Sequence, residues 1–108
     1  MKGKVINVSN VINTFPEKFR TDIEKATEIL KKYGCSEIYI FGSIANGKFD
    51  EYSDIDIAVK GLNARVYFKV LAEMERVLFS EVDLIVLDDE RDRFAQFILK
   101  EEELIKVG

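Results

Sequence analysis

Two aspartates stand two residues apart in the segment SDIDIAV, at positions 54 and 56. In a β-strand, residues i and i+2 project from the same face of the sheet, with Cα atoms about 6.5–7 Å apart. Asp54 and Asp56 would therefore project together from a strand whose alternate side chains enter the core, namely Ile55, Ile57 and Val59. Such a pair places carboxylate oxygens, the ligands of hard cations, at one point of a sheet.

A third acid, Asp83, stands in the segment VDLIV and shares a strand face with Ile85, opposite Val82, Leu84 and Val86. If the two strands are neighbours, three carboxylates can converge. Without partners they would repel one another, and their desolvation would cost on the order of several kcal/mol. Mg²⁺ removes this penalty and favours a few carboxylates together with phosphate oxygens. Two ions about 4 Å apart could activate an attacking hydroxyl and hold a triphosphate in line.

A glycine–serine pair, Gly42 and Ser43, directly follows the predicted strand EIYIF and opens a short helix over residues 44–46. Gly42 lets the backbone approach a ligand closely. The backbone amides and the Ser43 hydroxyl at that helix start would form an anion site suited to phosphate. The pattern therefore predicts a nucleotide whose phosphates lie between this turn and a metal held by Asp54, Asp56 and Asp83.

The residue composition limits the kinds of active site and ligand that this chain can have. The chain has 108 residues, a net charge of −4, no histidine and a single cysteine, Cys35, which we interpret as a small buried thiol. The absence of histidine excludes Ser-His and Cys-His triads and His-based zinc sites. No basic run supports general nucleic-acid binding. No apolar run approaches the roughly 18 residues of a membrane span, and no signal-peptide core is visible, so a cytoplasmic protein is expected.

Other charged residues have simpler interpretations. An aspartate pair at a strand end can be a solubilising device or a turn cap, although Gly42-Ser43 and Asp83 favour chemistry here. Asp88, Asp89 and Glu90 precede a predicted helix, where acids favour the dipole and the cap. Lys48 and Lys60 could contact phosphate, but the simpler interpretation is that both are solvated surface lysines. The run KEEELIK is read as a solvated helix face.

The predicted elements make a small α/β (α+β) fold in one domain, residues 1–108. A lead-in segment, residues 1–13, forms an arm or an edge strand. A helix follows from a capping box at Thr14–Glu17 to Gly34. Strands over 36–42, 54–60 and 81–88 share one sheet, and helices over 63–78 and 88–107 pack on it. The helical stripes, which include Met74, Phe94, Phe97, Leu104 and Ile105, are predicted to be core.

The runs FGSIANG, SDIDIAV eleven residues after Ser43, and VDLIV resemble the nucleotidyltransferase superfamily of the DNA polymerase beta type. The similarity spans roughly residues 17–105, and the short length resembles the minimal nucleotidyltransferase branch. The family often has a basic residue where this chain has Asn46, a position expected to tune the loop or the nucleotide contact.

The resemblance implies specific roles. Asp54 and Asp56 would bind both Mg²⁺ ions, and Asp83 would bind the catalytic ion and help deprotonate the acceptor hydroxyl. Gly42 and Ser43 would hold the β- and γ-phosphates. The implied reaction transfers a nucleoside monophosphate from an NTP onto a hydroxyl and releases pyrophosphate. AMP transfer from ATP is the favoured case.

Larger members of this superfamily add a second domain for the base and the acceptor, and nothing in this chain is left over to build one. A partner chain or a second copy, in a homo-oligomer, would complete the pocket. Minimal members of the MntA type pair with a helical HEPN toxin and neutralise it by binding, by adenylylating a tyrosine, or both. Three functions stay open: a protein adenylyltransferase acting as antitoxin, which we favour; an antitoxin that works by occlusion; and a small-molecule transferase, for instance one that modifies an antibiotic.

Overall fold

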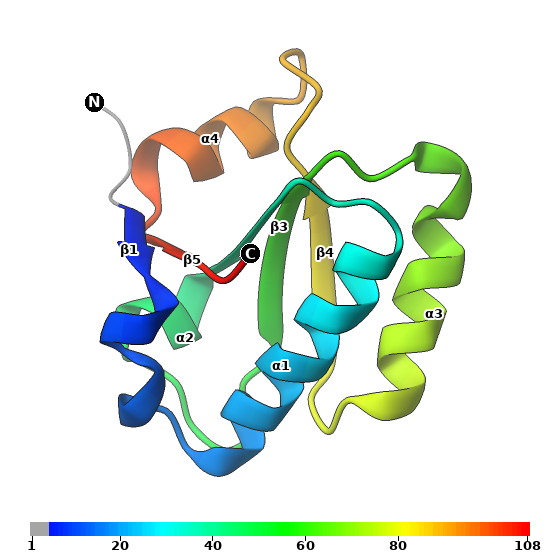
Figure 1. The fold of residues 1–108 in the computed structure, drawn as a ribbon. Coiled ribbons are helices and arrows are strands. Elements are labelled where there is room, and N and C mark those ends of the chain that lie inside the picture. Colours follow the sequence, from blue (N-terminus) through cyan, green and yellow to red (C-terminus); the bar gives the residue numbers. More distant parts are fainter. Residues whose placement is uncertain (1–4) are drawn as a thin grey trace.

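The computed structural model describes residues 5–108, and a five-stranded mixed sheet forms its centre (Figure 1). The strands lie in the order β1-β5-β2-β3-β4. Strand β2 runs antiparallel to β3 and β5, whereas β3 and β4 are parallel, as are β1 and β5. The strands are β1 (Val5–Asn7), β2 (Glu37–Phe41), β3 (Ile55–Lys60), β4 (Val82–Val86) and β5 (Leu104–Lys106).

Helices cover both faces of this sheet. They are α1 (Glu17–Lys32), α2 (Gly42–Asn46), α3 (Tyr67–Val77) and α4 (Arg93–Glu101), with short 3-10 turns at Val8–Asn10, Ile12–Thr14 and Ala64–Val66. Helices α1 and α3 pack side by side on one face, around a core that includes Phe19, Leu30 and Met74. Helix α4 covers part of the other face through Ala95 and Ile98, which belong to one buried cluster with Tyr39, Phe41, Ala58 and Leu87. The predicted α+β layer fold is therefore confirmed.

Helix α1 begins later than the sequence pattern indicates. Its N-cap is Pro16, which makes no side-chain cap hydrogen bond. The Thr14 hydroxyl instead donates to the carbonyl of Val11 at 2.6 Å, within the 3-10 turn that precedes the helix. The predicted capping box is therefore wrong, because the local turn takes the threonine that the cap would need. The predicted core stripe of α1 is confirmed, with Phe19, Ile23, Ala26 and Leu30 all buried.

The C-terminal segment differs most from the prediction. The helix ends at Glu101, and residues Leu104–Lys106 form strand β5 between β1 and β2. Leu104 and Ile105 are buried, at 3% and 1% exposure, but as strand residues on opposite faces of the sheet. Phe94 and Phe97 are each 51% exposed, so their assignment to the core is wrong. The small side chain of Ala95 lets α4 approach the sheet on the Ala95–Ile98 face instead.

The lead-in segment contributes an edge strand. Val5–Asn7 forms β1 and pairs with β5, whereas residues 1–4 lie outside the described part of the chain. Within residues 5–108, no helix is long and apolar enough to cross a membrane.

One buried charge ties α1 to the loop that leads into β4. Asp22 is fully buried, and its two carboxylate oxygens accept hydrogen bonds from the backbone amides of Phe79 and Ser80 at 2.9 and 3.0 Å. The backbone carbonyl of the next residue, Glu81, accepts a 2.8 Å hydrogen bond from the amide of Ile55. The chain is therefore fixed on both sides of the point where β3 and β4 begin.

Candidate active site

Asp56 and Asp83 lie side by side on neighbouring parallel strands. The register of β3 and β4 pairs Ile55 with Val82 and Asp56 with Asp83, and such strands run about 4.8 Å apart. Both carboxylates lie on the sheet face that α4 covers, because the alternate residues Ile55, Ile57 and Leu84 belong to the core under α1 and α3. Asp56 is half-buried and Asp83 is exposed. The predicted neighbourhood of these two acids is therefore present.

Asp54 stands just before β3, two residues ahead of Asp56, and is exposed. The hydrogen bond from the Ile55 amide to Glu81 holds this entry to the strand. Asp54 is close enough to Asp56 to raise its pKa, as described below. It is the most solvent-accessible part of the site on the β3 side.

Gly42 lies directly against Asp56. Strand β2 pairs Phe41 with Asp56, so the chain leaves the sheet at Gly42 beside the carboxylate. The φ angle of Gly42 is +73°, and a Cβ built there would stand 2.1 Å from Asp56 Oδ2. Ser43 follows, half-buried in the five-residue helix α2. Glycine is therefore required at this position for two reasons: its backbone is left-handed, and Asp56 occupies the space that a Cβ would need.

The electrostatics of this cluster are acidic. Burial is the largest cause that raises the pKa of Asp56, and together with the negative charges of Asp83, Asp54 and Glu102, in that order of influence, it brings this pKa to about 6. Burial and the charge of Asp83 also raise the pKa of Tyr67, whose hydroxyl donates to the carbonyl of Leu84. The ionised form of a carboxyl group whose pKa is raised in this way is stabilised by a nearby cation.

Glu102 is the site residue that the sequence pattern missed. The pattern placed it on a solvated helix, but it caps the end of α4, half-buried, and its charge acts on Asp56. The available signal was its spacing of two from Leu104, which puts both side chains on one face if the segment is extended.

The carboxylate oxygens of the three aspartates suit a hard cation, although the three side chains do not converge on one point. Within residues 5–108, no three acidic side chains are close enough together to hold a metal ion as they stand. The negative charges of Asp83 and Asp54 nevertheless act on Asp56 and raise its pKa. Mutual repulsion favours separated side chains, and a rotation about χ1 would be needed to bring neighbouring ones together around a cation. Mg²⁺ binding by these three aspartates stays a prediction.

Residues outside this cluster serve local structure. Asp88 accepts from the amide of Gly61 at 3.2 Å, and Asp89 accepts from the amide of Arg91 at 2.9 Å. The N-cap of α4 is Asp92, which accepts from the amides of Phe94 and Ala95. Lys60 Nζ lies 3.9 Å from Glu37 Oε2 at the far end of β3. Asn46 Oδ1 accepts from the amide of Lys48 at 3.0 Å, which closes the turn after α2.

The chain was compared with known proteins. The model of the family described as "Polymerase beta, Nucleotidyltransferase" matches residues 24–107. No curated protein gave a significant match. A solved structure of a minimal nucleotidyltransferase is 25% identical, with a TM-score of 0.62 over 80% of this chain and 91% of that one.

Two further similar structures are toxin–antitoxin assemblies. One, a toxin-antitoxin with AMP-PNP, is 26% identical, with a TM-score of 0.62 over 76% of this chain and 70% of the other. The second, a tyrosine-to-alanine mutant of the toxin-antitoxin MntA-HpeT, is 26% identical, with a TM-score of 0.59 over 76% and 69% of the two chains. The fold of this chain is therefore similar to that of a minimal nucleotidyltransferase and of chains in two toxin–antitoxin assemblies.

Proposed function

This chain belongs to the polymerase beta nucleotidyltransferase family, and we propose that it transfers AMP from ATP to a hydroxyl of a partner protein. The observation that carries the proposal is the contact between Gly42 and Asp56, with Asp83 paired beside them. Phosphates that approach the backbone at Gly42 would meet a cation held by these two carboxylates. This arrangement suits displacement at phosphorus better than any other reaction open to a chain without histidine.

Each residue has a defined part in the proposed reaction. Asp54 and Asp56 would hold two Mg²⁺ ions, and Asp83 would share the ion next to the acceptor. Bound Mg²⁺ supplies charge neutralisation at the triphosphate and acidifies the acceptor hydroxyl. Asp83 would help accept the proton as the hydroxyl oxygen bonds to the α-phosphorus. The bond from the α-phosphorus to the bridging oxygen breaks, and pyrophosphate leaves. Gly42 and Ser43 would hold the β- and γ-phosphates.

The biological role we propose is that of an antitoxin that modifies its toxin. Two similar structures are toxin–antitoxin assemblies, and one of them contains AMP-PNP, an analogue of ATP. We therefore propose ATP as the donor and a helical, HEPN-type toxin as the partner, with a tyrosine hydroxyl as the acceptor. The partner would supply the acceptor side of the site, which in this chain is the open face beside Asp83.

Mass spectrometry tests this function directly. An extract of the source cells is incubated with the purified protein, Mg²⁺ and ATP radiolabelled at its α-phosphate, and any labelled protein is identified and weighed. We expect one protein to gain the mass of one AMP on a tyrosine. The gain should disappear with Asp54→Asn and persist with Asp89→Asn, a matched change at an exposed aspartate that serves a local turn.

The occlusion alternative gives a different result in the same assay. If the partner is bound and neutralised without any change in mass, the protein acts as a binding module and the proposed transfer is wrong. Labelling of a small molecule without labelling of protein would identify a small-molecule transferase instead.

A further inference from the structure

Helix α4 buries one stripe and exposes two different flanks. Ala95 and Ile98 face the sheet. With 3.6 residues per turn, Gln96 and Lys100 lie on one flank, whereas Phe94 and Glu101 lie on the opposite one, with Phe97 next to them and further outward. The first flank borders a cavity of about 470 Å³, lined by Val5, Tyr39, Lys60, Gln96, Leu99, Lys100 and Leu104.

The position of this cavity shows which way the other flank faces. Lys60 is the last residue of β3, whereas Asp56 lies near the start of the same strand. Because the cavity flank of α4 contacts the Lys60 end, the opposite flank faces the end that carries Asp56 and Asp83. The influence of Glu102 on the pKa of Asp56 agrees with this orientation, since Glu102 follows the last turn of α4.

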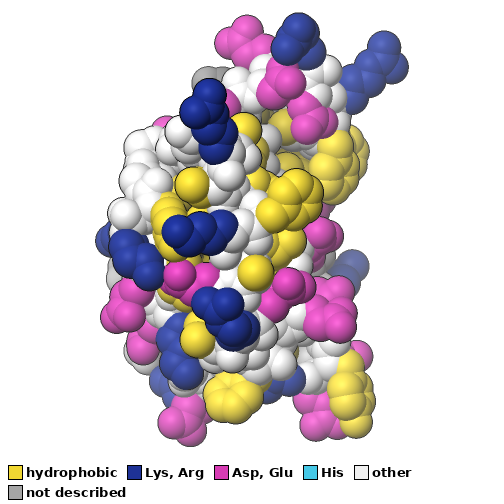
Figure 2. Space-filling view, turned by 90° about the vertical axis from the view of Figure 1, so that its right-hand side faces the viewer, with side chains coloured by type: hydrophobic (Ala, Val, Ile, Leu, Met, Phe, Trp, Pro, Cys, Tyr) yellow, Lys and Arg dark blue, Asp and Glu magenta, His cyan; other side chains and the backbone are white. Residues whose placement is uncertain are grey.

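Two large apolar side chains on that flank are left largely uncovered by the rest of residues 5–108. Phe94 and Phe97 are each 51% exposed, although both are aromatic residues that would favour burial. Figure 2, which views the molecule from the side of α3 and β4, shows exposed hydrophobic side chains at its upper right and acidic side chains below them. We call Phe94 and Phe97 the aromatic pair.

On the side that faces the sheet, the exposed charges beside the aromatic pair are acidic, whereas Arg93 lies one turn before Phe97 on the outward side of α4. Glu101 stands two turns beyond Phe94 on the same flank and one turn beyond Phe97. Asp54 and Asp83 are exposed on the adjoining sheet face. In the proposed reaction, a bound triphosphate would add more negative charge to this face. A partner that covers it must therefore offer apolar side chains for the phenylalanines and positive charge for the acids.

We propose that the aromatic pair is the docking surface for the acceptor protein, whose apolar patch with a basic rim brings the acceptor hydroxyl to Asp83. This inference rests on the proposed function and names the surface that selects its substrate. The acceptor has to enter on this face, because α1 and α3 cover the other one. On the edge strand β4, the Tyr67 hydroxyl already binds the Leu84 carbonyl, which disfavours strand pairing by a partner at that point.

Two other occupants fit less well. A second copy of this chain would bring a second acidic site against the first, and like charges facing each other weaken association. A nucleotide base stacks on a single ring, whereas two phenylalanines with an acidic residue on the same flank suit a larger, basic surface.

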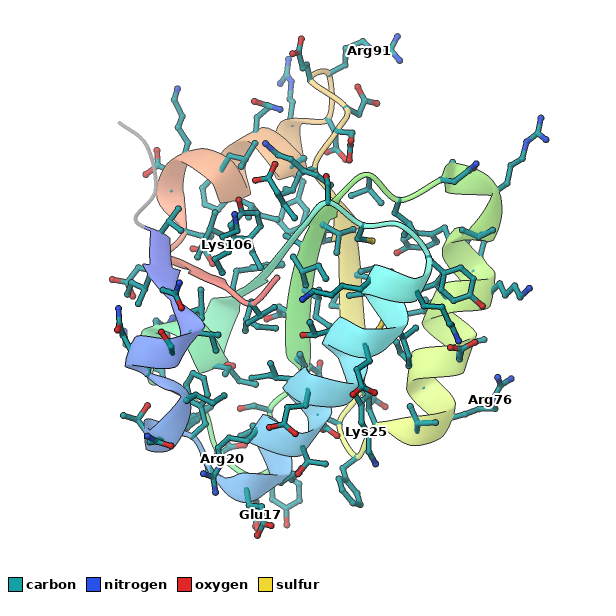
Figure 3. The ribbon with its side chains drawn as sticks, viewed as in Figure 1. Glu17, Arg20, Lys25, Arg76, Arg91 and Lys106 are labelled. Atoms are coloured by element: carbon teal, nitrogen blue, oxygen red, sulfur yellow. The ribbon has the colours of Figure 1, made fainter. Side chains whose placement is uncertain are left out.

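The test uses Phe94→Ser/Phe97→Ser, with Phe79→Ser as the matched control. Phe79 is 72% exposed, but its ring centroid lies 5.7 Å from Nζ of Lys25 and its backbone amide binds Asp22, so it lies against α1 and away from α4. Figure 3 labels Lys25 on α1. Glu101→Lys is a second variant that alters only charge. All variants are first checked for unchanged thermal unfolding and for unchanged affinity for an ATP analogue with Mg²⁺.

We expect the double variant to label its acceptor protein about tenfold less efficiently or worse, through a higher KM for the acceptor, as for the loss of two interface aromatics. Glu101→Lys should weaken labelling in the same way, and Phe79→Ser should not. Labelling by the double variant at the wild-type rate would overturn the inference. A loss of analogue binding would also overturn it, because the phenylalanines would then belong to the nucleotide site.

A second readout separates this inference from the proposed function. The immobilised variants are mixed with cell extract in EDTA, which prevents transfer. The docking surface is supported if mass spectrometry identifies a protein with a basic surface that the wild type and Phe79→Ser retain and the double variant loses, even if no AMP is transferred. Equal retention by all variants, or retention of this chain alone, would count against it.

Discussion

The backbone of Gly42 and the carboxylate of Asp56 occupy adjoining space, so that a Cβ built on Gly42 would stand 2.1 Å from Asp56 Oδ2. Residues 41 and 56 are register partners on β2 and β3, and the contact follows from that pairing. The turn that we assign to phosphates and the acid that we assign to a metal are therefore held together by the sheet. Their separation along the sequence is irrelevant to their distance in the fold.

Replacing Gly42 with alanine tests this contact. The new methyl group would force the Asp56 side chain to rotate away, and we expect transfer activity to fall by about a hundredfold, as for a misplaced catalytic group. The left-handed backbone adds a loss of about 1–2 kcal/mol in unfolding free energy. Gly47→Ala is the matched control: its φ is +80°, but nothing lies within 4 Å of the added Cβ. It should lose similar stability and keep its activity, and equal inactivation of both variants would contradict the account.

The raised pKa of Asp56 predicts a pH dependence. Cation binding needs the ionised carboxylate, and the pKa of Asp56 in the free protein is raised to about 6 by burial and by its acidic neighbours. At limiting Mg²⁺, kcat/KM should therefore fall below about pH 6 and level off above it. Glu102→Gln removes one of the charges and should move this midpoint to lower pH, whereas Glu103→Gln on the exposed neighbour should not. A midpoint near the ordinary value of an aspartate would contradict the prediction.

The same shift predicts that Asp56 destabilises the fold. Its pKa in the folded state exceeds the unfolded value of 3.8, so the folded state holds the proton more tightly. The penalty is absent below about pH 4, grows as the pH rises towards 6, and is constant above that. Asp56→Asn should stabilise the protein at pH 7.5 by about 1 kcal/mol, after allowance for solvent screening. Thermal unfolding at pH 7.5 and at pH 4 checks this, and a gain of equal size at both would refute it.

Asp22 is expected to matter for stability without any part in the reaction. Asp22→Ala leaves the amides of Phe79 and Ser80 unpaired in a buried region, and we expect a loss of about 2–4 kcal/mol in unfolding free energy. Asp89→Ala, which removes an acceptor at an exposed turn, should change it by less than about 1 kcal/mol. Urea unfolding measures both, and a small effect at Asp22 would show that the loop before β4 is held by other contacts.

The sequence was sufficient for the parts of the fold with strong periodicity. The alternation around Asp54 and Asp56 and the apolar run VDLIV predicted β3 and β4, and the register then brought Asp56 and Asp83 together. Strand β5 could not be predicted in this way, because three residues after the acidic run of α4 fit a helical stripe equally well. Its place depends on the gap between β1 and β2, which is a property of the assembled sheet.

The same limit explains the errors at the site and on the surface. The sequence alone does not distinguish Glu102 from the other acids of its run. Only the folded chain, in which β5 follows α4, brings its charge close enough to act on Asp56. Phe94 and Phe97 are predicted to be buried because their spacing is helical. The helix instead packs on the sheet through Ala95, whose small side chain permits a closer approach. Which side of an amphipathic helix is buried depends on the partner surface as well as on its own pattern.

The central claim is that Asp54, Asp56 and Asp83 hold Mg²⁺ against a nucleotide seated at Gly42 and Ser43. Isothermal titration with a non-hydrolysable ATP analogue, with and without Mg²⁺, measures this directly. We predict binding that requires Mg²⁺, that weakens by about tenfold or more in Asp54→Asn/Asp83→Asn, and that is unchanged in Asp89→Asn. Binding of equal affinity in all three proteins, or binding indifferent to Mg²⁺, would contradict the account.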